Sequence, residues 1–201
     1  MQRMIMYSVM IMVLGLYGCK QSLTPEEYIT WTENNDDFTS SQALGDAVYE
    51  FRMKPANYLI SRESAGRPVA SDSVVSRQKD LSDMIYFNLK IYPKDGHADL
   101  LRKDGPDVGL YQRRIYYYSF TFQEDIHLVI GGDTLPCLLY HYIHDHGLSP
   151  EMDFTMAFER PASDADFKIV LEDAVMNTGK LTFPFSADVL TDLPELKLSS
   201  I

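Results

Sequence analysis

The sequence predicts a mainly β domain, an antiparallel β-sandwich with a few short helices. Roughly seven to eight β-rich apolar segments recur at intervals of about 10–15 residues, a spacing typical of sandwiches. Turn residues such as Gly131-Gly132-Asp133 separate these segments. The chain also lacks the regular alternation of strands and helices that is typical of parallel βα folds. An immunoglobulin-like layout is one arrangement that this spacing allows.

The first element expected after the N-terminal region is a short helix that begins at Thr24-Pro25-Glu26-Glu27. Threonine is a good N-cap, proline suits the first helical position, and acidic side chains favour the positive end of the helix dipole. The polar run 33–37 ends this helix. Tyr28 and Trp31 form a small apolar face that we expect to dock on the domain.

Residues 47–53 are the first expected strand, because apolar and charged side chains alternate there. A hairpin is the best supported tertiary unit, since Gly131-Gly132-Asp133 supplies the positive φ angles that a tight turn needs. Pro184 indicates an edge position for the last strand. Further strands are expected at 84–92, 115–122, 125–130, 134–142, 154–158, 167–173 and 181–185, and short helices at 55–60 and 74–83.

The aromatic segment 115–122 is a candidate ligand platform. On a strand, its even-numbered aromatic residues from Tyr116 to Phe122 would share one face and Tyr117 would lie on the other. Aromatic platforms bind sugar rings or peptides, and they also fill sandwich cores. The core interpretation is favoured for the shared face, which leaves Tyr117 as the candidate ligand-binding residue.

Four of the five histidines lie in or near one hairpin, at His127, His141, His144 and His146. Three imidazoles with a water molecule would suit a catalytic zinc ion, and Asp145 is adjacent. A metal site made by His141, His144 and His146 is therefore one hypothesis. The other is a polar strand end with exposed histidines, because no known metal-binding spacing is present.

The cysteines and the charge restrict the biochemistry. The formal net charge is −11, which argues against nucleic acid as a partner because phosphates would be repelled. Of the two cysteines, Cys137 lies in an apolar neighbourhood and is expected to be a buried, inert thiol. No nucleophile motif, phosphate-binding loop or Cys-x-x-Cys is present. The run 34–37 could supply oxygen ligands to calcium, but it lacks the remainder of an EF-hand loop and reads as a solvated linker.

The clearest motif is Leu16-Tyr17-Gly18-Cys19, at the end of an apolar run that starts at Met4 and follows the basic residue Arg3. The run is about 13 residues long, within the range of signal peptides and too short to span a bilayer. These features resemble a bacterial lipoprotein precursor with its lipobox. The resemblance implies cleavage before Cys19, a lipid on its thiol and an amide-linked fatty acid such as palmitate on its amine. Two or three chains would anchor the protein stably.

The resemblance divides the chain into a signal peptide (1–18), a lipid-anchored arm with a short helix (19–45) and a β-rich domain (46–201). It implies the cell envelope, at the periplasmic or surface face of the outer membrane, since Lys20 is not the aspartate that retains lipoproteins at an inner membrane. The leading hypothesis is a non-enzymatic binding or accessory subunit with a protein partner in the envelope and no cofactor. The alternatives are a zinc-dependent hydrolase that uses the histidines, and a sugar- or peptide-binding lipoprotein.

Overall fold

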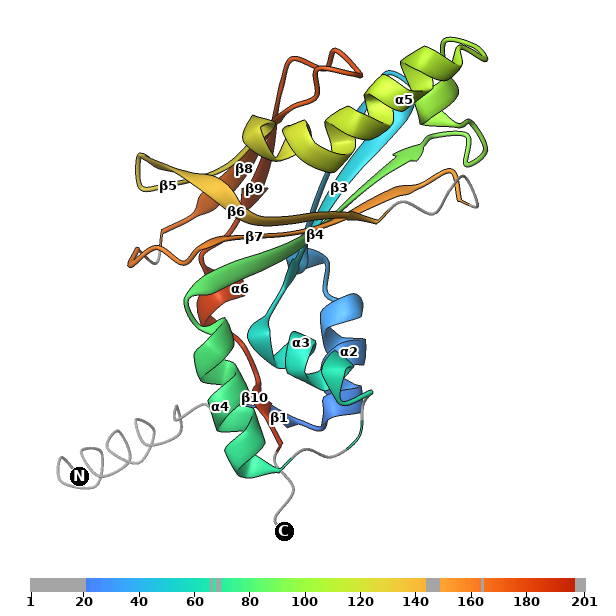
Figure 1. Ribbon diagram of the computed structural model, residues 1–201. Coiled ribbons are helices and arrows are strands. Elements are labelled where there is room, and N and C mark those ends of the chain that lie inside the picture. The colour runs from blue at the N-terminus through green and yellow to red at the C-terminus, as the bar shows by residue number, and fades with distance from the viewer. Residues whose placement is uncertain (1–20, 66, 68–69, 144–148, 164, 198–201) are drawn as a thin grey trace, which may run out of the picture.

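The structure is a computed structural model that describes residues 21–65, 67, 70–143, 149–163 and 165–197 (Figure 1). The signal peptide, Cys19, His144 and His146 lie outside the described residues. Within those ranges, none of the helices has the length and apolar character needed to cross a membrane.

Most of the domain is one antiparallel sheet of eight strands, so the prediction of a mainly β, antiparallel fold is confirmed. Neighbouring strands alternate in direction throughout. In spatial order they are β2 (Thr39–Leu44), β3 (Ala47–Lys54), β4 (Met84–Pro93), β7 (Met152–Glu159), β6 (Asp133–Ile143), β5 (Ile126–Ile130), β8 (Phe167–Glu172) and β9 (Lys180–Phe185). β9 is an edge strand, as Pro184 predicted.

The long strand β6 makes the sheet fold back on itself. Its first residues pair with β5 and its later ones with β7, and the register shifts between Cys137 and Leu139. A bulge at such a point bends the strand. β8 and β9 therefore face β3 and β4 across an aromatic core, in which the rings of Phe51 and Phe183 lie 4.7 Å apart.

The two edge strands approach each other, so the sheet is nearly closed into a barrel. The Gln42 side chain on β2 donates a hydrogen bond to the Thr182 carbonyl on β9. The facing layers thus belong to one continuous sheet, and the immunoglobulin-like layout that the strand spacing allows, which has two separate sheets, is not confirmed. The spacing of strands along the chain does not distinguish one folded-back sheet from two separate sheets, because the difference depends on the bulge in β6.

The strand predicted at 115–122 is wrong, because these residues are helical. α5 (Val108–Tyr116) continues into a π-helical turn, η3 (Tyr117–Thr121), and a 3₁₀ turn, η4 (Phe122–Asp125). Asp107 caps α5 by accepting a hydrogen bond from the Leu110 amide. Tyr118 and Phe122 are four residues apart and are both buried. Aromatic residues at every second position also lie four residues apart, so this run fits the periodicity of a strand and that of a helix. Tertiary packing selects the helix.

A helical layer lies on the other side of the sheet from α5 (Figure 1). It contains α2 (Pro25–Glu33), α3 (Ala56–Glu63) and α4 (Ser71–Leu81), which confirms the three short helices predicted from sequence. Shorter elements are η1 (Asp36–Phe38), η2 (Leu100–Arg102) and α6 (Asp188–Thr191). A second apolar cluster joins this layer and comprises Leu23, Tyr28, Tyr58, Ile60, Val74, Leu81 and Leu196.

The segment assigned to the N-terminal arm is integrated into the fold. Residues 39–44 form β2 of the main sheet, and α2 shares the second apolar cluster with α3 and α4. β1 (Ser22–Leu23) pairs in parallel with β10 (Glu195–Leu196). The Glu195 and Lys197 amides donate to the carbonyls of Gln21 and Leu23, at 2.9 and 2.7 Å. The chain is therefore held to the domain from its first described residues.

Candidate functional site

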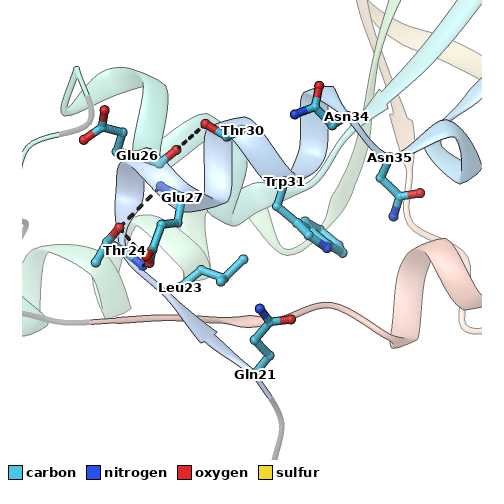
Figure 2. Close-up of a pocket in the computed structure, with 9 residues that line it drawn as sticks. All are labelled: Gln21, Leu23, Thr24, Glu26, Glu27, Thr30, Trp31, Asn34 and Asn35. Carbon is cyan, nitrogen blue, oxygen red and sulfur yellow. Dashed lines mark hydrogen bonds between the residues drawn. The ribbon is translucent and has the colours of Figure 1, made fainter.

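A hollow of about 710 Å³ lies beside α2 in the helical layer and is drawn in Figure 2. Trp31 projects from α2 across this hollow toward the segment that leads to β10, and Leu23 and Gln21 lie nearby. The nine lining residues are Gln21, Leu23, Thr24, Glu26, Glu27, Thr30, Trp31, Asn34 and Asn35.

The start of α2 is fixed by a capping box. The Glu27 amide donates to the Thr24 hydroxyl, and the Glu27 carboxylate accepts from the Thr24 amide at 2.8 Å and from its hydroxyl at 2.9 Å. These bonds lower the pKa of Glu27, with the Thr24 amide as the largest cause. Glu27 is therefore a fixed anion at the end of the hollow.

The ring of Trp31 is held by two other aromatic rings. Tyr28, one turn earlier, is fully buried and meets Trp31 edge-on at 5.6 Å between ring centroids. Phe38 at the end of η1 meets it edge-on at 5.3 Å. Trp31 itself stays partly exposed. A preoriented indole that keeps one accessible side is suited to stacking on a ligand.

A second hollow of about 260 Å³ adjoins the first, because Trp31 and Asn35 line both. Its other lining residues come from η1 and from the region of α6, and they are Asp37, Phe38, Ser186, Asp188, Val189 and Asp192. We call the two hollows together the α2 trough. Five carboxylates line this trough, and its described lining contains no lysine, arginine or histidine.

The predicted histidine group is only partly described. His127 on β5 lies opposite Pro136, and His141 lies five residues farther along β6, which places the two histidines roughly 16 Å apart along the strand. Within the described part of the chain, no three His, Cys, Asp or Glu side chains gather closely enough to hold a metal ion. A site that includes His144 and His146 stays a prediction, because both lie outside that part.

Tyr117, the predicted ligand-binding residue, has its hydroxyl engaged inside the protein. It donates to Asp125 at 2.7 Å and accepts from the Ala174 amide at 3.1 Å. The exposed aromatic residues are instead Tyr116 and Phe120, which are 63% and 69% exposed and pack together at 5.1 Å. The strand interpretation placed these two on the shared face that was expected to fill the core, so the helical geometry reverses the assignment.

Cys137 is a buried free thiol, as predicted. Burial raises the pKa of its thiol to about 12, so the reactive thiolate is scarce at neutral pH. The thiol contacts the Leu139 carbonyl at 3.1 Å, within the bulge of β6. Its position indicates packing in the core and gives no role in chemistry.

The sequence carried part of the signal for the α2 trough. Trp31 is the single tryptophan of the chain, and it stands next to the polar run 33–37. That run was interpreted as a linker or calcium-binding segment, whereas Asn35 caps η1 through a 3.0 Å bond from the Asp37 amide and also lines the trough. The α6 side of the trough lies more than 150 residues away in sequence, and no local pattern connects it to Trp31.

Comparison with protein-family models, with curated proteins and with solved structures finds no match to this chain. The class of protein is therefore defined by the fold and by the trough: a mainly β domain with a helical layer that carries an acidic, tryptophan-containing trough.

Proposed function

We propose that this protein is a lipid-anchored protein of the bacterial cell envelope, attached through Cys19, that acts without catalysis as a binding or accessory subunit of an envelope complex. The observation that carries the proposal is the position of the lipobox next to folded chain. Cys19 precedes the first paired residue, Ser22, by three residues, which span about 10 Å at most.

This short connection constrains how the domain sits on a membrane. With acyl chains on Cys19, the β1–β10 pair and the adjacent end of α2 lie at the bilayer surface. α5 lies at the opposite end of the molecule (Figure 1), and its last residue is the exposed Tyr116. The domain is therefore presented in one orientation, which suits a subunit that recognises a partner at a fixed height above the membrane. The outer membrane is the proposed location, because Lys20 follows Cys19.

The α2 trough supports a binding role. It combines a preoriented indole with amide groups and carboxylates, and an indole beside polar groups can contact a peptide or a sugar. This observation also favours the peptide- or sugar-binding form of the proposal, with the α2 trough in place of Tyr117 as the contact surface.

Metabolic labelling with an alkyne-tagged fatty acid tests the anchor. We expect label on the wild-type protein and on Cys137→Ala, and none on Cys19→Ser. Cys137→Ala is the matched control, because it removes the other cysteine and leaves the lipobox intact. Label that persists on Cys19→Ser would contradict the proposed attachment.

Crosslinking in native membranes, followed by co-purification, tests the subunit role. We expect a partner in stoichiometric amount with the wild-type protein and a loss of that partner when Cys19→Ser releases the protein from the membrane. A protein that purifies alone with crosslinkers of several lengths would overturn the accessory-subunit role.

A further inference from the structure

The charged side chains in the described lining of the α2 trough are all negative. Glu26 and Glu27 line its first hollow, and three aspartates line the second, namely Asp37, Asp188 and Asp192. Of the described contacts, only the Glu27 carboxylate has hydrogen bonds within the protein, and they come from the neutral Thr24. Lys197 is the one basic group that helps to lower the pKa of Glu27, and its effect is the smallest of the causes.

Carboxylates without a basic partner favour a cationic ligand. Their summed field attracts positive charge, and a concave surface strengthens that field. The ring of Trp31 adds an interaction of the same sign, because the face of an indole attracts ammonium and guanidinium groups. A neutral sugar would satisfy the indole and the amides of Asn34 and Asn35, but it would leave the carboxylates without counter-charge.

The trough also has an apolar side that a small cation would not use. Its accessible part is the ring of Trp31, whereas Leu23, Phe38 and Val189 also line the two hollows but are buried. Together the two hollows measure nearly 1,000 Å³, at the upper end of the usual size of small-molecule sites. An extended peptide fits both properties, because its side chains can alternate between apolar and basic groups along one line.

We propose that the α2 trough binds an extended peptide segment rich in arginine and lysine, with Trp31 stacked on one cationic side chain and the aspartates near α6 paired with the next. The proposal rests on the proposed binding function and names the chemistry of its partner. With Cys19 anchored, the trough lies beside the membrane, so the segment belongs to a partner that is itself held near that membrane.

Because Trp31 is the single tryptophan of the chain, its fluorescence can report binding in the trough. Fluorescence of the full chain, purified in a neutral detergent and excited at wavelengths where tyrosine does not absorb, comes from Trp31 alone. Titration with oligoarginine and oligolysine is expected to change this fluorescence in a saturable way, and salt is expected to weaken the binding. Oligoglutamine and a chito-oligosaccharide are the neutral probes, and we expect no saturable change with either.

The decisive comparison uses two charge-matched double variants. Asp188→Asn with Asp192→Asn removes two carboxylates from the trough, and we expect the oligoarginine affinity to fall about tenfold. Asp46→Asn with Glu124→Gln removes the same charge from exposed positions that do not line the trough, and we expect a change below about twofold. Both variants change exposed side chains whose carboxylates accept no described hydrogen bond, so their unfolding midpoints should match the wild type.

Equal losses in the two variants would show non-specific attraction to an acidic protein and would overturn the proposal. A response to the chito-oligosaccharide in place of oligoarginine would identify a sugar site and would overturn it as well. The assay does not depend on lipidation, so a failure of binding is distinguishable from a failure of fatty-acid labelling at Cys19.

Discussion

The hydroxyl of Tyr118 donates a 2.8 Å hydrogen bond to the carboxylate of Asp173, and both side chains are fully buried. Tyr49 donates to the same carboxylate oxygen at 3.0 Å. The amides of Val175 and Met176 donate to the other oxygen, each at 2.9 Å. One buried acid thus connects β3, η3 and the loop between β8 and β9. A buried carboxylate is tolerated when its oxygens are satisfied in this way.

Asp173→Asn should destabilise the fold by about 2–4 kcal/mol. The amide nitrogen of asparagine would face hydrogen-bond donors, whichever way the side chain is turned, and at least one buried donor would lose its acceptor. Tyr49→Phe is the matched control, because it removes one donor and leaves the carboxylate, so we expect a loss of about 1 kcal/mol. Denaturant unfolding measures both. An unchanged midpoint for Asp173→Asn would show that these bonds contribute nothing.

The contribution of Asp173 to the free energy of unfolding should depend on pH, and it should decrease as the pH rises. Burial raises the pKa of Asp173 above the usual aspartate value of 3.8 and outweighs the hydrogen bonds, which lower it. A group whose pKa is raised by folding contributes stability that is fully present below the unfolded pKa and is lost as the pH rises through the folded pKa. The stability difference between wild type and Asp173→Asn should therefore fall as the pH rises above 3.8 and become constant at higher pH. A difference that grows over this window would contradict the raised pKa.

Tyr117→Phe should cost about 1 kcal/mol of stability, because the Tyr117 hydroxyl bridges Asp125 and the Ala174 amide. Its neighbour Tyr116 provides the control. Tyr116 is 63% exposed, so Tyr116→Phe removes the same atom at the surface and should change stability by less than about 0.5 kcal/mol. Thermal unfolding distinguishes the two, and equal effects would rule out the bridging role of Tyr117.

The elements that local patterns determine could be predicted from sequence. The Thr24 cap sets the start of α2, and the glycine turn sets the hairpin in which Ile130 pairs with Asp133. The alternation in β3 places Tyr49 and Phe51 inside. In contrast, the run from Tyr116 to Phe122 carries a pattern that fits both a strand and a helix. Packing against the sheet decides between them, and local sequence does not contain that information.

The candidate site was less predictable than the fold because it is assembled from distant segments. Trp31 and Asn35 belong to one end of the chain, whereas Asp188 and Asp192 belong to the other. The pairing of β1 with β10 brings these ends together, and each of these strands has only two residues. Strands this short leave no periodic pattern, so the sequence indicates the Trp31 side of the trough at most and gives no indication of the α6 side that completes it.

The cap of α2 links local stability to the trough. Thr24→Ala removes the hydroxyl that accepts from the Glu27 amide and frees the Glu27 carboxylate from one of its two bonds. We expect a loss of about 1 kcal/mol in the free energy of unfolding, the usual cost of losing an N-cap. Because Trp31 lies on the same helix, its indole should become more accessible, and a neutral quencher should reduce its fluorescence more strongly than in the wild type. Thr30→Ala is the matched control: its hydroxyl only bonds back to the Glu26 carbonyl within α2, and alanine favours helix, so stability should stay the same or rise slightly. A cap variant as stable as the control would show that packing through buried side chains such as Tyr28 holds α2 without the cap, and that the capping box does not shape the trough.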